Sequence, residues 1–139
     1  MKKILVIILF LGIISCSNTE DPNDILPDIP VNVTLYLNNP SNNNLLSVGG
    51  WVEKTGGIKG IVVYHASIDN YLAYDLACPH LQPSACTKMI IEDGLTMKCT
   101  CDETKFALAL GGAPQSGTQF PARQYRVIKN GDSLIITNF

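Results

Sequence analysis

Short apolar, β-branched runs separated by turn-forming residues constrain this chain more than any other feature of its sequence. The clearest pair, residues 125–128 and 133–137, encloses an Asn-Gly step. Asn-Gly between two apolar runs is the strongest short-range hairpin signal. Two more hairpins are predicted, one from 60–65 with 71–76 and one from 89–91 with 95–98. No long helical periodicity follows the N-terminal run, so we expect an all-β fold of about eight short strands.

The N-terminus has the features of an export signal. Lys2 and Lys3 precede a continuous apolar run at 4–14. This run suits a secretory signal, and it is too short to span a bilayer, which needs roughly 20 apolar residues. The run ends in Ile-Ile-Ser-Cys, which resembles the lipobox of bacterial lipoproteins. That resemblance implies a signal peptide at 1–15, lipidation of Cys16 and a mature chain anchored to a membrane outside the cytoplasm.

The remaining chain divides into a tether and one domain. Residues 16–30 are expected to form the lipidated cysteine and a flexible tether, because Ser, Asn, Asp, Glu and Pro leave little apolar surface to bury. The acidic start of this segment resembles the surface-export signals of some outer-membrane lipoproteins, although a plain solvated linker has the same composition. Residues 31–139 are enough for one domain with its own core. The formal net charge of −2 and the scattered Lys and Arg residues argue against a nucleic-acid partner.

Four cysteines besides Cys16 carry the chemistry of the chain: Cys78, Cys86, Cys99 and Cys101. Their spacing permits three full disulfide pairings, and two structural disulfides are the simplest interpretation in an oxidising compartment. The tripeptides Cys-Pro-His at 78–80 and Cys-Thr-Cys at 99–101 each follow a predicted strand. Two such loops can hold a metal between their tips, and thiolates with imidazole suit iron or zinc.

The two boxes resemble those of the Rieske [2Fe–2S] family. The chain has Ala-Cys-Pro-His-Leu at 77–81 and Lys-Cys-Thr-Cys-Asp-Glu-Thr-Lys-Phe at 98–106. The family has a Cys-x-His box and a later box that typically reads Cys-Pro-Cys-His-Gly-Ser-x-Phe. The resemblance covers residues 31–139. It implies stacked antiparallel sheets or a small barrel, with the cluster-binding loops at one end.

The resemblance also implies roles for individual residues. Cys78, His80 and Cys99 match three of the four cluster ligands. Cys86 and Cys101 match the cysteines that join the two loops through a disulfide in high-potential members. The residues expected to surround the cluster are Thr104, Phe106 and Pro114.

Two residues depart from the family pattern. Asp102 stands in place of the second histidine and is a doubtful fourth ligand, since a carboxylate is anionic where imidazole is neutral. Glu103 stands in place of glycine and would strain the loop if a positive φ is needed there. The signal lacks a twin-arginine pair, so the chain is expected to cross the membrane unfolded, without a cluster made in the cytoplasm.

Three interpretations remain open. The first is a [2Fe–2S] electron carrier for a partner enzyme, with Cys78, His80, Cys99 and Asp102 as ligands. The second is a cluster-free Rieske fold with a binding or structural role, held by Cys86–Cys101 and by a Cys78–Cys99 bond. The third, less favoured, is zinc on the same four residues as in the first.

Each interpretation has a structural consequence. Sulfur atoms of Cys78 and Cys99 at bonding distance would indicate the second interpretation. A redox partner would dock over His80, with Leu81 and residues 111–114 as an apolar collar.

His65 lies within a strand pattern and is expected to be structural. No Ser-His-Asp set, phosphate-binding loop or catalytic carboxylate pair is recognisable, so the chain is not expected to be an enzyme.

Overall fold

A computed structural model describes residues 25–139. The predicted signal peptide, Cys16 and most of the predicted tether lie outside the described residues. Within the described part, no helix has the length and apolar composition needed to cross a membrane. The described elements are β1 (Asn32–Tyr36), η1 (Pro40–Leu46), β2 (Trp51–Lys54), β3 (Ile61–Ser67), β4 (Asn70–Asp75), β5 (Met89–Glu92), β6 (Thr96–Cys99), β7 (Lys105–Ala107), η2 (Leu108–Leu110), β8 (Ala113–Pro114), β9 (Gln124–Asn130) and β10 (Ser133–Thr137).

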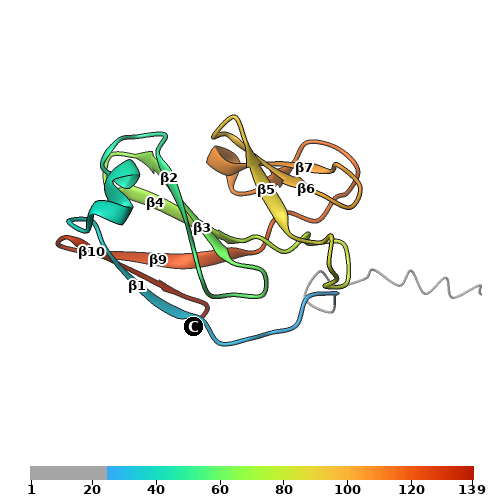
Figure 1. Ribbon diagram of the computed structural model, residues 1–139, viewed down its shortest axis with the longest axis horizontal. Coiled ribbons are helices and arrows are strands. Elements are labelled where there is room, and N and C mark those ends of the chain that lie inside the picture. The colour runs from blue at the N-terminus through green and yellow to red at the C-terminus, as the bar shows by residue number, and fades with distance from the viewer. Residues whose placement is uncertain (1–24) are drawn as a thin grey trace, which may run out of the picture.

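The strands form two antiparallel sheets, which confirms the predicted all-β class. The larger sheet has the order β1-β10-β9-β4-β3-β2, and the smaller has the order β5-β6-β7-β8. The smaller sheet lies at one end of the larger one (Figure 1). The chain passes from β4 into the smaller sheet and returns to the larger sheet at β9.

All three predicted hairpins are present. They are β3–β4, β5–β6 and β9–β10. In the last of these, Asn130 is paired with Ser133, so the turn consists of Gly131 and Asp132. Gly131 has φ 57°, a conformation that glycine adopts without steric cost. Between β1 and β2 the chain forms η1. The Asn39 side chain accepts a hydrogen bond from the Ser41 N–H there, and Pro40 starts the helix.

The core has two parts, and β3 contributes to both. Val63 and Ile61 pack into a cluster over the larger sheet. Val62 and Tyr64 point to the opposite face, into a cluster formed mainly with residues of the smaller sheet and its loops. Successive side chains of a strand point to opposite faces, so a strand buried on both faces shows a continuous apolar run rather than alternation. The second cluster also contains Cys78 and both core methionines, and it supports the candidate site.

Part of the predicted tether packs on the domain. Leu26 is only 2% exposed, and the Arg123 guanidinium donates hydrogen bonds to the carbonyls of Leu26 and Pro27. The Asn138 side chain donates to the Ile29 carbonyl and accepts from the Val31 N–H. The packed domain therefore begins by Leu26 rather than at Val31. Side chains from the C-terminal part of the chain form hydrogen bonds with the backbone groups of this segment.

Candidate functional site

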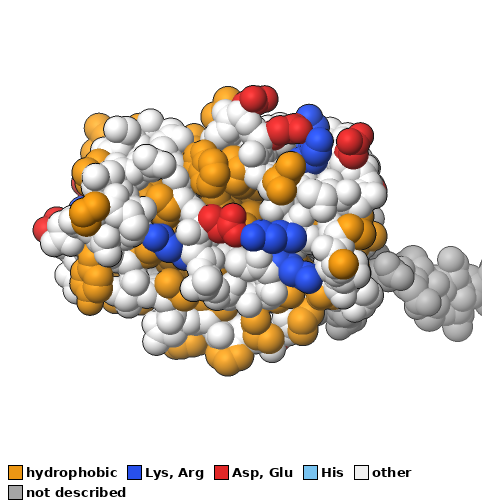
Figure 2. All heavy atoms as spheres, viewed as in Figure 1, with side chains coloured by type: hydrophobic (Ala, Val, Ile, Leu, Met, Phe, Trp, Pro, Cys, Tyr) orange, Lys and Arg blue, Asp and Glu red, His pale blue; other side chains and the backbone are white. Residues whose placement is uncertain are grey.

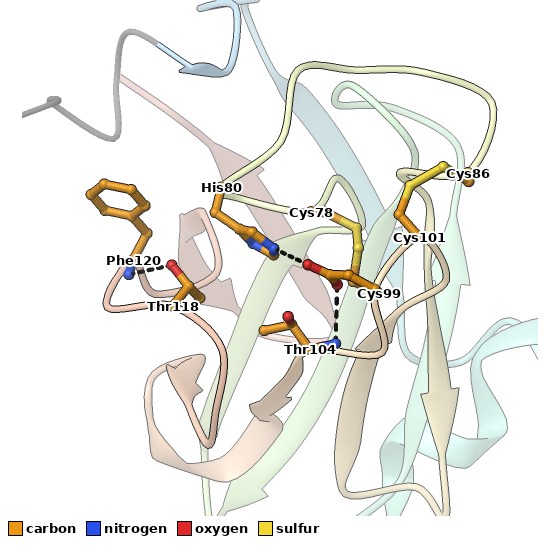
Figure 3. A network of polar contacts seen from close by, with 9 residues as sticks. Cys78, His80, Cys86, Cys99, Cys101, Thr104, Thr118 and Phe120 are labelled. Carbon is orange, nitrogen blue, oxygen red and sulfur yellow. Dashed lines mark hydrogen bonds and ion pairs between the residues drawn. A yellow bond between two sulfur atoms is a disulfide. The ribbon is translucent and has the colours of Figure 1, made fainter.

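Two loops meet at the end of the smaller sheet, where the sequence places the cysteine boxes (Figure 3). The first loop, residues 76–88, connects β4 to β5, and the second loop, residues 100–104, connects β6 to β7. The first loop is closed at its base by a bridge between Ala77 and Lys88, with Cys78 N–H donating to the Thr87 carbonyl. Across the loops, the Thr100 hydroxyl donates to the Cys86 carbonyl.

The four cysteines form two disulfides, which join the first loop to the end of β6 and to the second loop. Cys78 is bonded to Cys99, and Cys86 is bonded to Cys101. Cys78 and Cys99 have no exposed surface and lie in the second core cluster. Cys86 is exposed and Cys101 is half-buried. This arrangement is the one expected for the cluster-free interpretation.

Asp102 interacts with the histidine that remains in the site. Its Oδ2 lies 2.6 Å from His80 Nε2, and its Oδ1 accepts a hydrogen bond from the Thr104 N–H. Burial alone would raise the pKa of Asp102, but its hydrogen bonds with His80 and Thr104 hold that pKa below the ordinary value. The carboxylate at the position of the missing histidine thus joins the two loops directly. Figure 3 shows the His80 side chain beside the Cys78–Cys99 bond.

Glu103 has the backbone conformation that the sequence analysis identified as a source of strain. Its φ is +64°, in the left-handed region, and its N–H donates to the Cys99 carbonyl. For a residue with a Cβ, this conformation is less stable than an ordinary one by roughly 1–2 kcal/mol. The loop therefore keeps the backbone path that glycine allows, although glycine is absent.

The expected surrounding residues lie close to the paired loops. Thr104 and Phe106 are buried, and the Phe106 ring centroid is 6.1 Å from that of His80. Pro114 lies opposite Phe106 in the β7–β8 pair. A Cβ on Gly117 would lie 2.7 Å from the Thr104 hydroxyl, so glycine allows the loop after β8 to approach the second loop.

The expected apolar collar is only partly exposed. Leu81 is half-buried and packs against the second core cluster, and Gly112 is buried. Leu110, which directly precedes the predicted collar, is 72% exposed. On the face in Figure 2, acidic and basic side chains lie next to one another. An ion pair between Glu53 and Lys88 joins β2 to the end of the first loop.

The sequence analysis gave Asp75 no role, yet this residue positions the start of the first loop. Its carboxylate has no exposed surface and accepts hydrogen bonds from the Ala77 N–H and the Tyr125 hydroxyl. It also accepts from the N–H groups of Ile58 and Lys59. The signal for this role was its position at the end of an apolar run, three residues before Cys78. His65 is remote from this site and stacks on Tyr71, with ring centroids 4.4 Å apart.

The side chains in this arrangement do not fit a [2Fe–2S] cluster. A Rieske cluster needs two thiolates on one iron and two imidazoles on the other. Here the sulfur atoms of Cys78 and Cys99 are bonded to each other, and the other two ligand positions hold the imidazole of His80 and the carboxylate of Asp102. The predicted ligands are brought together, but as a disulfide and a His–Asp pair. With both bonds formed, none of the four cysteines is a thiolate.

Comparison with known proteins identifies the fold. No protein-family model and no curated protein sequence matches the chain. Among solved structures, a complex of reduced oxygenase and oxidized ferredoxin in carbazole 1,9a-dioxygenase aligns at 17% identity and a TM-score of 0.50, over 77% of this chain and 93% of that chain. The ferredoxin of carbazole 1,9a-dioxygenase from Nocardioides aromaticivorans IC177 aligns at 19% identity and a TM-score of 0.48, over 78% and 97% of the two chains. The chain has a Rieske-like fold.

Proposed function

We propose that this chain is a lipid-anchored protein of the bacterial envelope whose Rieske-like domain works without an iron–sulfur cluster, as a disulfide-stabilised binding module. The observation that carries this proposal is the bond between Cys78 and Cys99. These two residues match the cluster cysteines of the family, and a bonded pair supplies no thiolate for iron.

Three further features support the proposal. Asp102 pairs with His80 across the two loops, so the carboxylate has a structural partner without iron. The bonded cysteines are buried in the core, where a disulfide packs as an apolar group. The N-terminal signal lacks the twin arginines expected for export of a folded, cluster-loaded domain.

The binding partner is expected to be a protein. One of the aligned structures is a complex of an oxygenase with a ferredoxin, so a domain with this fold docks on another protein there. The exposed Leu110 and the half-buried Leu81 offer apolar contacts beside the paired loops. As in the sequence analysis, the chain is not itself an enzyme, which agrees with the ferredoxin name of that neighbour.

Electron transfer through a [2Fe–2S] cluster is the second candidate function. It is favoured by the fold shared with the ferredoxin complex and by the convergence of His80, Cys99 and Asp102. It requires an open Cys78–Cys99 bond and Asp102 as the fourth ligand. A redox partner would then dock over His80.

Iron content and thiol state separate the two candidates. The mature protein is purified from membranes in detergent without oxygen, alkylated under denaturing conditions and analysed by mass spectrometry. We expect no iron, no visible absorption and no alkylation at Cys78, Cys86, Cys99 or Cys101. Two irons per chain, with Cys78 and Cys99 alkylated after iron removal, would overturn the proposal in favour of electron transfer.

Replacement of Cys16 tests the proposed location. With the native chain, labelled fatty acid is expected to enter the protein, and density fractionation is expected to find it with the outer membrane. Cys16→Ala should abolish the label. A native chain that remains unlabelled and stays in the soluble fraction would contradict lipid anchoring.

A further inference from the structure

The paired loops gather donor groups suited to a metal other than an iron–sulfur cluster. Ligand atoms of His80, Cys99 and Asp102 all lie within 4.8 Å of one another, and Cys78 is bonded to Cys99. Donor atoms around tetrahedral zinc lie about 3.3–3.8 Å apart, given zinc–donor distances of 2.0–2.3 Å. Opening the disulfide would supply two thiolates beside this imidazole and carboxylate.

A second observation concerns the other ring nitrogen of His80. Nδ1 is buried and has no hydrogen-bond partner among the described residues, and the side chain is only 10% exposed. Leaving a buried polar atom unpaired is unfavourable, so this nitrogen lacks an interaction that a ligand would supply. Nε2 is already held by the Asp102 carboxylate. An imidazole with a carboxylate on one nitrogen and a metal on the other is the usual arrangement at protein zinc sites.

We propose that opening the Cys78–Cys99 bond converts the paired loops into a zinc site, with Cys78, Cys99 and Nδ1 of His80 as ligands and Asp102 as a positioning residue. Three protein ligands leave the fourth position to water. This inference rests on the proposed function, because it takes the bonded, cluster-free state as its starting point. In the bonded state the site does not exist, so the disulfide and the metal exclude each other.

The conversion is a thiol–disulfide exchange. A dithiol reductant gives two electrons and two protons to the Cys78–Cys99 bond and becomes a disulfide itself. Zinc then displaces the two thiol protons as it binds the thiolates. A disulfide oxidant reverses the sequence, reforms the protein bond and releases Zn²⁺. The exposed Cys86 gives a reductant access first to the Cys86–Cys101 bond, which helps to hold the loop that carries His80.

Zinc binding to the reduced full chain tests the proposal. The protein is treated with a phosphine reductant and then titrated with Zn²⁺, and with Co²⁺ to read thiolate coordination from visible absorption. The matched control is Cys86→Ser with Cys101→Ser, which removes the other cysteine pair and keeps the four proposed residues. Circular dichroism establishes that each reduced variant remains folded.

The expected results differ among the variants. The reduced native chain and the control should bind one Zn²⁺ per chain, with a tetrahedral Co²⁺–thiolate spectrum. His80→Ala and Cys99→Ser should weaken binding by at least about 100-fold, and Asp102→Asn by about 10–100-fold with the Co²⁺–thiolate spectrum retained. The unreduced chain should bind no zinc.

Two results would overturn the proposal. One is a folded, reduced control that binds no zinc. The other is binding that His80→Ala leaves unchanged, which would indicate adventitious binding to thiols. Neither result bears on whether the isolated protein is free of iron, so failure of this inference and failure of the proposed function can be told apart.

Discussion

Both disulfides join the first loop to residues 99–101, but the two bonds lie in different surroundings. Cys78 and Cys99 are separated by 21 residues and have no exposed surface, whereas Cys86 and Cys101 are separated by 15 residues and lie at the surface. Loop-closure entropy grows only logarithmically with loop length, so the two bonds restrict the unfolded chain almost equally, by about 3 kcal/mol each. Any large difference between the two bonds in their contribution to stability or in their rate of reduction must therefore come from packing and access to solvent.

The largest expected effect is on stability. Cys78→Ala with Cys99→Ala should lower the free energy of unfolding by about 4–5 kcal/mol, because loss of two buried sulfur atoms adds a packing cost to the entropic one. Cys86→Ala with Cys101→Ala should cost about 3 kcal/mol. Urea denaturation followed by the fluorescence of Trp51, the single tryptophan, measures both. If both variants lose the same free energy of unfolding, packing of the buried sulfur atoms does not make the Cys78–Cys99 bond the more stabilising one.

The second effect is on the rate of reduction. A water-soluble reductant should open the Cys86–Cys101 bond about 100-fold faster than the Cys78–Cys99 bond under native conditions, because the rate depends on access to the sulfur atoms. Timed alkylation with mass spectrometry identifies which cysteines become free. The control is the same experiment with urea added below the unfolding midpoint. Partial unfolding should expose the Cys78–Cys99 bond and bring the two reduction rates closer together. Simultaneous loss of both bonds would show that opening of the whole loop pair limits the reaction.

The third effect concerns Glu103, in the second loop between β6 and β7. Glu103→Gly should stabilise the domain by about 1 kcal/mol, because glycine adopts φ +64° without the penalty of a Cβ. Glu103→Ala is the matched control, since it removes the carboxylate but keeps the Cβ. The same urea denaturation measures both variants. If alanine stabilises as much as glycine, charge rather than backbone strain is the cause.

The smallest effect is a pH dependence at Asp102. Because its folded pKa lies below the ordinary value of 3.8, the stability it contributes is fully present above that value and is lost as pH falls through the folded pKa. Its side chain is 38% exposed, so solvent screening limits the contribution to less than about 1 kcal/mol. The free energy of unfolding should therefore fall less below pH 4 in Asp102→Asn than in the native chain. An identical pH profile in both proteins would contradict this role.

Much of the fold was predictable because it is encoded in local patterns. The hairpin around Asn130 and Gly131 follows from turn chemistry between two apolar runs, and β9 and β10 pair as expected. The strained conformation at Glu103 was also foreseen, because the family pattern has glycine there. The order of strands in the larger sheet was not predictable, since the pairing of β4 with β9 joins segments separated by the whole smaller sheet. Burial of Leu26 was missed because its partner Arg123 is distant in sequence.

By itself, the sequence determined the all-β class, three hairpins and the two boxes that gather the cysteines. It left three disulfide pairings possible and gave Asp102 only as a departure from a ligand pattern. Tertiary structure decided that Cys78 is bonded to Cys99 and that Asp102 faces His80. The two loops meet because Met89 pairs with Cys99 in the β5–β6 hairpin and Ala77 is bridged to Lys88. Spacing along a chain limits which side chains can approach one another, but packing between distant segments determines which of them do.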